Sequence, residues 1–225
     1  MDIGLFAMTY SEENYLKVIY HLSAAAAKGS ITTNAIAAEM ESKASSVTDM
    51  MQKLAEKDLV AYKKYQGVSL TEKGRFTALM IVRKHRLWEV FLLEKLDFSW
   101  DEVHDVAEQL EHIKSEKLTN KLEEFLEFPT EDPHGDPIPD RNGKLPKMDK
   151  KLLSEIGAGK MVICVGVKDS SPPFLQYLDK QQIALGSGIE VLAKEDFDLS
   201  LQLRVDGKEV TVSNKIAANL FVKPV

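Results

Sequence analysis

One stretch, residues 32–71, decides the fold, and it reads TTNAIAAEMESKASSVTDMMQKLAEKDLVAYKKYQGVSLT. At its start, Thr32-Thr33-Asn34 offers short polar side chains that cap the first turn of a short helix. After a brief turn, Ser45 and Ser46 can cap a second helix that runs to about Lys57. Two short helices joined by a turn predict a helix–turn–helix.

The second half of the stretch predicts a β-hairpin. Residues 59–65 alternate between apolar and polar side chains, Gln66-Gly67 is typical of a turn, and residues 68–71 form the return strand. Residues 12–27, further upstream, carry apolar side chains at helical spacing. A helix, a helix–turn–helix and a hairpin in this order predict a winged-helix DNA-binding domain.

The predicted second helix supplies the candidate DNA contacts. In a helix–turn–helix, residues near the start of this helix enter the major groove. Short hydroxyl and amide side chains there can contact phosphates or base edges, and lysines on the helix and the hairpin can contact the backbone. The candidate DNA-contacting residues are Lys43, Ser45, Ser46, Thr48, Asp49, Gln52, Lys53, Lys63 and Lys64.

The rest of the chain predicts two further domains. Helical spacing continues from residue 71 to about residue 128 and is followed by a loop rich in proline and glycine. From Lys160, short apolar strands separated by glycine and asparagine predict a small β-barrel. We expect a mainly α protein with a β-rich C-terminal domain: a winged helix at 1–75, a helical domain at 76–145, a linker at 146–159 and a β-barrel at 160–225.

The net charge of the 225-residue chain is −6, and the excess of acidic groups lies in one block. Residues 76–150 carry 11 basic and 17 acidic side chains, whereas the blocks on either side are balanced. An acidic chain argues against indiscriminate binding to nucleic acid but allows a local basic face. A carboxylate-rich middle block is what a cation site needs.

The cysteine content and the apolar runs indicate the compartment. Cys164 is the one cysteine and lies in the apolar run Met161–Val165, which indicates a core residue and excludes an internal disulfide framework. No run of about 18 apolar residues is present, so we expect no membrane span. Acidic Asp2 and Glu12 stand where a secretion signal needs a basic start and an apolar stretch. We therefore expect a cytoplasmic protein.

Metal-ligand residue types gather in the segment HDVAEQLEH, residues 104–112. His104, Glu108, Glu111 and His112 stand at offsets 0, +4, +7 and +8. On a single helix these side chains fall within a stripe of roughly 100°. Imidazole and carboxylate groups on one stripe suit a borderline-to-hard divalent cation.

A second pair of ligand types, His85 and Glu89, stands four residues apart on the preceding helical run. Four of the five histidines lie between residues 85 and 134. Of these, His134 lies in the loop rich in proline, and we assign it to loop structure. The two clusters together predict a metal-sensing region.

With these motifs in order, the chain resembles the DtxR/MntR family of metal-dependent transcriptional repressors. The resemblance covers about the first 145 residues. The β-rich tail resembles, more weakly, the SH3-like third domain of the longer members. The motifs that carry it are Glu13–Leu16, Ser46–Thr48, Arg83–Leu87, His104–His112 and Pro133–Pro139, with Phe174–Leu178 and Leu185–Val191 in the tail.

The resemblance implies two metal sites in each chain. The implied ligands are Glu108, Glu111, His112 and Asn14 in the first site, and His85, Glu89, His104 and Asp169 in the second. Manganese sensors usually carry aspartate, and iron sensors methionine, where this chain has Asn14. Lys17 stands where two-domain manganese sensors carry a further carboxylate, which argues against their paired-metal arrangement.

Position 108 favours one metal over another. Iron-sensing relatives place cysteine there and manganese-sensing relatives glutamate, so Glu108 gives a site of oxygen and nitrogen donors alone. Such hard ligands suit Mn²⁺, with Fe²⁺ as the alternative. Zn²⁺ or Co²⁺ would occupy the same ligands in vitro, because a site of this kind binds these ions tightly whichever metal it senses in the cell.

The resemblance implies a homodimeric repressor that binds double-stranded operator DNA when metal-loaded and controls metal-uptake genes. We expect no enzymatic activity and no small organic substrate. The alternatives are an iron-responsive repressor, a helical-bundle metalloenzyme and a winged-helix regulator that senses an organic ligand. The metalloenzyme class needs Glu-x-x-His motifs on two helices, which the region from His85 to His112 lacks.

Overall fold

The computed structural model describes residues 8–25, 30–63 and 66–225, which form two compact units. The first unit contains the described part of residues 1–85 together with residues 108–121 and 139–145. The second contains residues 86–107, 122–138 and 146–225. Three helices contribute residues to both units: α4 (Glu72–Leu96), α5 (Val103–Leu110) and α6 (Glu116–Phe125).

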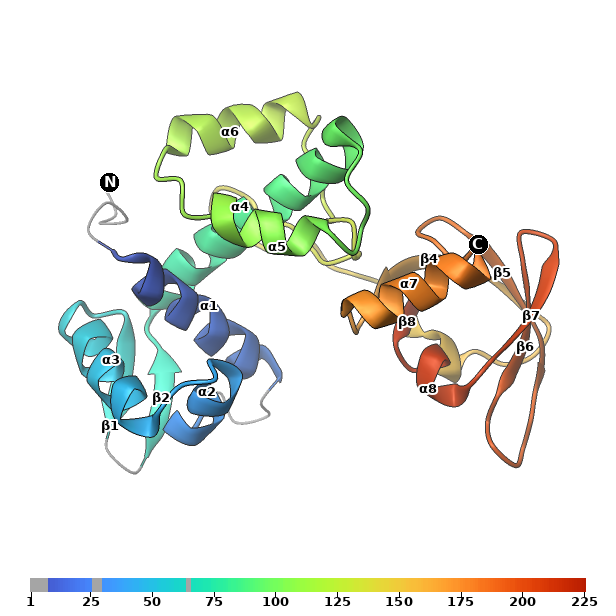
Figure 1. The fold of residues 1–225 in the computed structure, drawn as a ribbon, viewed down its shortest axis with the longest axis horizontal. Helices are drawn as coiled ribbons and strands as arrows, with labels where there is room; N and C mark the ends of the chain where they lie inside the picture. The colour runs from blue at the N-terminus through green and yellow to red at the C-terminus, as the bar shows by residue number, and fades with distance from the viewer. Residues whose placement is uncertain (1–7, 26–29, 64–65) are drawn as a thin grey trace. The chain divides into compact units, whose positions relative to one another are not determined.

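The N-terminal part of the first unit is a winged helix–turn–helix, as predicted (Figure 1). Its elements are α1 (Tyr10–Ala25), α2 (Thr33–Glu39), α3 (Ala44–Glu56), β1 (Val60–Lys63) and β2 (Gly67–Leu70). The predicted cap on α2 is confirmed, because the Thr32 hydroxyl accepts the Ala35 N–H at 3.1 Å. The two strands pair antiparallel and form the wing.

Two local predictions in this region are wrong by a residue or more. Lys43 is the extended residue that precedes α3, so Ser45 and Ser46 lie inside the first turn of the helix and cap nothing. Gly67 pairs with Lys63 and begins the return strand, so it lies beyond the turn that Gln66-Gly67 was expected to form. Lys64 lies outside the described residues.

The core of the first unit joins α1 to the helix–turn–helix. Leu16 and Ile19 of α1, Ile36 of α2, and Met51 and Leu54 of α3 are all fully buried in one cluster. Each such side chain contributes about 1.5–3 kcal/mol through burial. The orientation of α1 is therefore fixed by its packing against the DNA-binding helices.

The start of α4 approaches the first wing strand closely. The Thr71 hydroxyl accepts the Gly74 N–H at 2.9 Å and caps the helix, in agreement with the predicted start near residue 71. A Cβ atom on Gly74 would lie 1.8 Å from the Leu59 carbonyl oxygen, so only glycine fits at this position.

The second unit contains a six-stranded antiparallel sheet in the order β3-β8-β4-β5-β6-β7. Along the chain the strands are β3 (Lys151–Leu152), β4 (Lys160–Val167), β5 (Gly188–Lys194), β6 (Leu201–Val205), β7 (Lys208–Val212) and β8 (Leu220–Pro224). The expected β-rich C-terminal domain is confirmed. β3 and a following 3-10 turn (Leu153–Glu155) fall within the stretch expected to be a linker.

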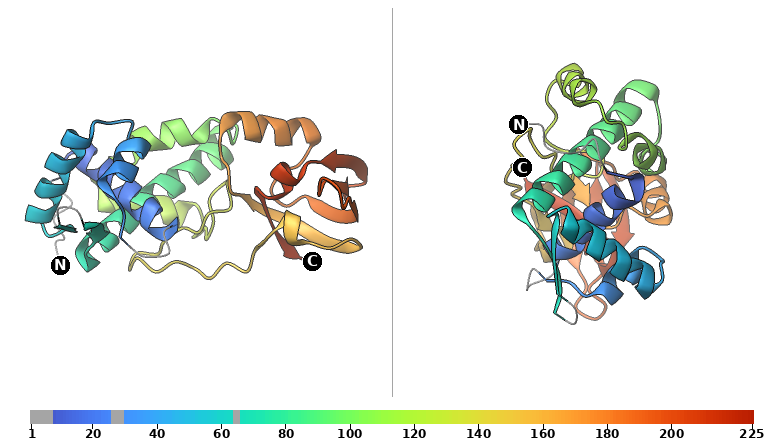
Figure 2. Two further views of the ribbon diagram at one scale, coloured as in Figure 1. Left: turned by 90° about the horizontal axis from the view of Figure 1, so that it is seen from below. Right: turned by 90° about the vertical axis from the view of Figure 1, so that its left-hand side faces the viewer.

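Two helices of this domain were not predicted. Helix α7 (Pro172–Gln181) lies along one side of the sheet, and α8 (Asn214–Ala217) is a single turn before β8 (Figures 1 and 2). Helix α7 begins with two prolines, and it buries Phe174, Leu175 and Leu178. Its ten residues give too short a periodic pattern to stand out among strands.

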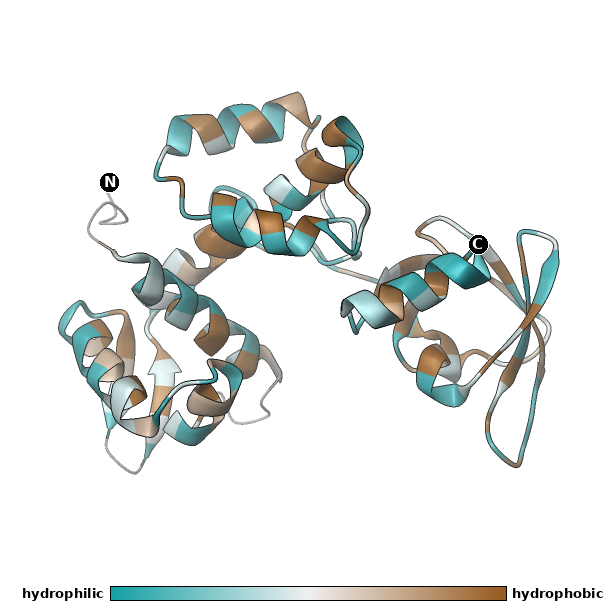
Figure 3. Ribbon diagram, in the orientation of Figure 1, coloured by the Kyte–Doolittle hydropathy of each residue, from teal (hydrophilic) through white to brown (hydrophobic). Residues whose placement is uncertain are grey.

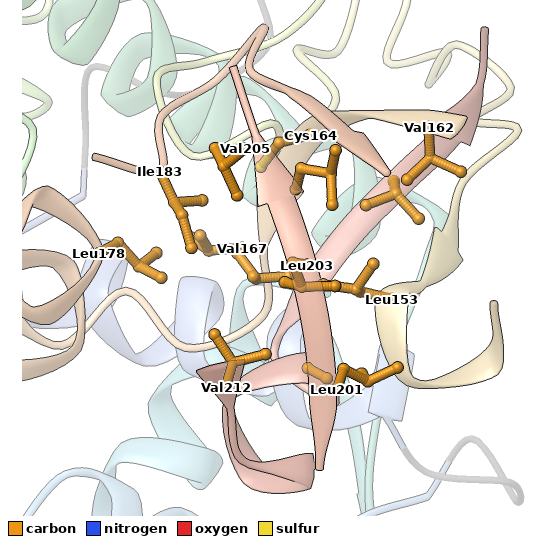
Figure 4. Packing of buried hydrophobic residues seen from close by; sticks show 14 of the residues in the cluster. Leu153, Val162, Cys164, Val167, Leu178, Ile183, Leu201, Leu203, Val205 and Val212 are labelled. Carbon is orange, nitrogen blue, oxygen red and sulfur yellow. The ribbon is translucent and has the colours of Figure 1, made fainter. Parts of the chain in front are cut away.

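The core of the second unit is shown in Figure 4, where side chains from several strands and α7 converge. Cys164 belongs to this core, as expected, and burial raises the pKa of its thiol to about 11. Trp100, from the segment before α5, belongs to the same apolar cluster. The cluster therefore joins the sheet domain to the segment that leads into α5.

The loop rich in proline also packs against the sheet. The Val167 N–H donates to the His134 carbonyl at 2.8 Å. A Cβ atom on Gly135 would lie 1.9 Å from the Val165 carbonyl oxygen, so the loop can approach β4 only with glycine here. This contact places His134 at a fixed position.

Apolar and polar positions alternate along α5 and α6, as the colours of Figure 3 show. This pattern is typical of helices with one buried face. Within the described ranges, no helix has both the length and the apolar character needed to cross a bilayer.

Candidate metal centre

In the first unit, a lysine of α1 binds one glutamate in the last turn of α5 and another just beyond the helix. Lys17 Nζ donates to Oε1 and Oε2 of Glu111, each at 2.8 Å, and also to Oε1 of Glu108. Glu111 is fully buried and Lys17 nearly so. A positive charge thus already lies between two of the predicted metal ligands.

His85 of α4 also contacts Glu111. Its Nδ1 atom is 2.7 Å from Glu111 Oε2. Burial acts to raise the pKa of Glu111, but His85 and Lys17 outweigh it and hold that pKa below its usual value. One ligand atom from each of His85, Glu108 and Glu111 lies within 4.8 Å of the others, a spacing that can hold a metal ion.

Two further predicted ligands, His112 and Asn14, belong to the same unit. His112 directly follows Glu111 in the sequence, and Asn14 lies on α1, three residues before Lys17. His112 Nδ1 is 2.7 Å from Glu13 Oε2, and the His112 ring stacks on Tyr10 with centroids 4.4 Å apart. Asn14 Oδ1 is buried without a hydrogen-bond partner. A buried oxygen of this kind is costly unless something binds it, which fits the predicted ligand role of Asn14.

The predicted geometry of the stripe is partly wrong. Helix α5 ends at Leu110, and Glu111 and His112 lie in the turn that follows. The contacts of Glu111 with Lys17 and His85, and that of His112 with Glu13, therefore depend on this turn and on its packing against α1 and α4, not on helical periodicity. The role of Glu13 as the partner of His112 was missed, because its position beside Asn14 was read only as part of a motif.

In the second unit, the buried Glu89 of α4 is the centre of another cluster, in which His104 is half-exposed. His104 Nδ1 lies 3.3 Å from Glu89 Oε1, and His134 Nδ1 lies 3.7 Å from the same atom. His134 Nε2 is 2.9 Å from the Trp100 carbonyl oxygen. Glu89, Asp132 and His134 each offer a ligand atom within 4.8 Å of the others.

The charges in this cluster shift two pKa values. Burial and the nearby Glu89 raise the pKa of Asp132 to about 7, against the effect of Arg86. Burial acts to lower the pKa of His134, but its contact with Glu89 outweighs this and raises the pKa to about 9. The loop histidine therefore carries a positive charge beside Glu89 near neutral pH.

Asp169, the proposed fourth ligand of the second site, makes a local contact. Its Oδ1 atom accepts the Ser171 N–H at 2.9 Å, just before α7. Within the described part of this unit, Asp132 and not Asp169 lies with Glu89 and His134 in a group of metal-ligand spacing.

The candidate DNA-contacting residues lie on one helix and the wing. Lys43, Ser45, Ser46, Asp49, Gln52 and Lys53 are exposed on or just before α3, and Lys63 is exposed on β1. Thr48 is partly exposed, and its hydroxyl donates to the Ala44 carbonyl at 2.9 Å. The predicted recognition helix therefore presents a polar outer face.

The residues of the first unit fit a divalent cation. The donors are carboxylates, imidazoles and an amide oxygen, and no thiolate is among them. The ammonium between Glu108 and Glu111 marks a place where positive charge is stabilised. Asn14, on the same helix as Lys17, has a buried oxygen without a hydrogen-bond partner. Hard and borderline donors of this kind suit Mn²⁺ and Fe²⁺.

Comparison with known proteins agrees with this architecture. Three domain families match consecutive parts of the chain: the iron-dependent repressor N-terminal DNA-binding domain at 7–68, the iron-dependent repressor metal-binding and dimerisation domain at 71–140, and the FeoA domain at 151–224. A solved manganese-dependent transcriptional repressor in complex with manganese is 34% identical, with a TM-score of 0.82 over 95% of this chain and 100% of that chain. The chain belongs to the DtxR/MntR family of metal-dependent transcriptional repressors.

Other similarities lie within and beyond the DtxR/MntR family. The iron-dependent repressor IdeR of Mycobacterium leprae is 28% identical over 222 residues, which cover 93% of this chain and 86% of that protein. A probable metal transport system membrane protein of Chlamydia trachomatis is 44% identical over 91 residues. That match covers 40% of this chain but only 20% of the transport protein.

Proposed function

We propose that this protein is a manganese-responsive transcriptional repressor and not an enzyme. It binds operator DNA as a homodimer in the cytoplasm and controls metal-uptake genes. The observation that carries the proposal is the convergence of His85, Glu108 and Glu111 within the unit that holds the winged helix. The matched ranges 7–68, 71–140 and 151–224 support functional domains near the expected boundaries of 1–75, 76–145 and 160–225.

The first metal site is formed by Asn14, Glu108, Glu111 and His112. Support comes from the unpartnered oxygen of Asn14 and from the fully buried carboxylate of Glu111 in the turn after α5. The proposed second site is formed by His85, Glu89, His104 and Asp169. Support comes from the contact between His104 and Glu89 and from the buried position of Glu89.

The bound ion supplies a positive charge that carboxylates from α5 and an oxygen from α1 share. Asn14 then ties α1 to the turn after α5, and Leu16 and Ile19 connect α1 to the core of the winged helix. An ion that binds one arrangement of α1 more tightly than another shifts the population toward that arrangement. Metal binding and DNA binding are therefore linked equilibria.

The donor set favours manganese over iron. Glu108 gives the first site a carboxylate where a softer thiolate would favour other metals. The likeness to a manganese-dependent repressor points the same way. The similarity to the iron-dependent repressor of Mycobacterium leprae keeps an iron-responsive repressor as the alternative.

The test is a titration of metal-free protein with Mn²⁺, in which electron paramagnetic resonance counts the free ion. We expect one to two ions per chain, and binding of promoter DNA from metal-uptake genes only when the ions are present. Glu108→Ala and Glu111→Ala should abolish the metal dependence of DNA binding. The matched control is Glu116→Ala, at an exposed acid at the start of α6. It should change neither the number of bound Mn²⁺ ions nor the metal dependence of DNA binding. Metal-dependent DNA binding that survives both site variants would refute the proposal.

A further inference from the structure

Lys17 is bound where the first metal site needs a cation. Its side chain is 10% exposed and reaches Glu111, whose side chain is fully buried. Its ammonium group has three N–H donors, and the contacts with Glu108 Oε1, Glu111 Oε1 and Glu111 Oε2 match that number. The lysine thus neutralises part of the charge of this carboxylate pair from within the chain.

A divalent ion and this ammonium compete for the same carboxylates. A metal ion bound between Glu108 and Glu111 would use oxygens that now accept the Lys17 N–H groups. Like charges at contact distance repel strongly, and partial burial weakens the screening. The flexible four-carbon stem of lysine lets the ammonium move away without a change in the backbone of α1.

We propose that Lys17 is an internal counter-cation that a single divalent ion displaces when the first site is loaded. The inference rests on the proposed metal-sensing function. Binding is then an exchange of one ammonium for one metal ion, which lowers the apparent affinity of the site. In the metal-free protein Lys17 keeps α1 connected to the end of α5, so the carboxylates are not left uncompensated.

The first experiment compares the Mn²⁺ affinity of Lys17→Gln, Lys17→Arg and the unchanged protein. Lys17→Gln should bind Mn²⁺ at least tenfold more tightly, because no charge needs to be displaced. The metal-free Lys17→Gln protein should melt at a lower temperature than the unchanged protein. Its melting temperature should also rise more when Mn²⁺ is added. Lys17→Arg keeps the charge and should stay close to the unchanged protein.

Lys57→Gln is the matched control for the loss of one positive charge. Lys57 Nζ pairs with Glu12 at 2.7 Å in the same unit, away from Glu108 and Glu111 in the chain. Its loss should leave the Mn²⁺ affinity unchanged. A Lys17→Gln protein that is folded by circular dichroism but binds Mn²⁺ no more tightly than the unchanged protein would overturn the inference.

A second measurement needs no substitution. Lysine acetylation followed by mass spectrometry should show little labelling of Lys17 in the metal-free protein. Saturating Mn²⁺ should increase the labelling of Lys17 severalfold and leave that of Lys57 unchanged. Unchanged Lys17 labelling at saturation would overturn the exchange.

The two proposals fail in different ways. If neither the unchanged protein nor Lys17→Gln binds Mn²⁺ or Fe²⁺, the metal-sensing function fails, and the exchange fails with it. If the unchanged protein binds Mn²⁺ with reduced affinity after Glu108→Ala, but Lys17→Gln gives no tighter binding, only the exchange fails.

Discussion

At the scale of single residues, His134 has an environment that ties its charge to the fold. It is buried between Glu89 and the Trp100 carbonyl, and its backbone carbonyl accepts an N–H from β4. A protonated imidazole satisfies both side-chain contacts, since each ring nitrogen then donates. A neutral ring can donate to only one of them.

This environment predicts a pH dependence of stability. The pKa of His134 rises from the ordinary value of 6.5 to about 9 on folding. A raised pKa means that the contribution is fully present below pH 6.5 and is lost as the pH rises through 9. The free energy of unfolding of the metal-free protein, measured in urea, should therefore fall between pH 6.5 and 9.5 by on the order of 1–3 kcal/mol more than that of His134→Gln. Parallel pH profiles for the two proteins would contradict this expectation.

The sequence indicates candidate ligand types but not their long-range partners. His104, Glu108, Glu111 and His112 stand close together in the chain, so their pattern is visible in the sequence. The pairing of Lys17 with Glu111 joins residues 94 positions apart, and that of His134 with Glu89 depends on how a loop meets the sheet. No local pattern encodes such contacts, because they arise from tertiary packing.

At the scale of the elements, α3 is the part of the structure most directly suited to DNA. Lys53 is exposed in its last turn, on the helix that presents the predicted base-reading residues. Winged helices of this kind use lysines for phosphate contacts and short polar side chains for bases.

Lys53→Ala should weaken binding to operator and to unrelated DNA by similar factors. A lysine that neutralises one phosphate releases about one counterion, so the slope of log affinity against log salt should become shallower by about 1. Fluorescence anisotropy at several salt concentrations measures both quantities, with Mn²⁺ saturating. Lys117→Ala, an exposed lysine in α6, is the control and should leave the slope unchanged. A selective loss for the operator alone would instead assign Lys53 to base recognition.

The start of α4 shows how one element depends on its neighbour. Gly74 sits in the first turn, where a Cβ would lie 1.8 Å from the Leu59 carbonyl oxygen. Gly74→Ala should reduce the free energy of unfolding by about 2 kcal/mol, because overpacking outweighs the better helix propensity of alanine. Gly157→Ala is the control, since its added Cβ meets nothing within 4 Å. Equal denaturant midpoints for the two variants would show that α4 can shift at no cost.

The elements also show where sequence patterns succeed. The cap at Thr32, the start of α4 near residue 71 and the periodicity of α4 were predicted, because capping and amphipathic spacing are local properties. The end of α5 at Leu110 was not, since the segment continues with helix-compatible residues and only the tertiary contacts of Glu111 and His112 favour a turn. Helix α7 was missed for another reason, because its ten residues give too short a periodic pattern to stand out among strands.

At the scale of the whole molecule, the two units share two helices that carry proposed ligands. Helices α4 and α5 each contribute residues to both units. In the first unit, α1 contacts the end of α5 through Lys17 and also packs on the DNA-binding helices. A change of cation at Glu108 and Glu111 therefore acts on an element that belongs to the winged-helix core.

This connection predicts reciprocal coupling between metal and DNA. If Mn²⁺ tightens operator binding by a given factor, operator DNA must tighten Mn²⁺ binding by the same factor, since both describe one thermodynamic cycle. A coupling of about 1–3 kcal/mol corresponds to a factor of roughly 5 to 150. Mn²⁺ titrations with and without saturating operator, set beside operator titrations with and without Mn²⁺, measure the two factors independently.

Asn14→Ala should reduce both factors together, because it removes the one proposed ligand on α1 and leaves Glu108, Glu111 and His112 in place. A loss of Mn²⁺ affinity in that variant with unchanged coupling would mean that the signal reaches the winged helix by a route other than α1.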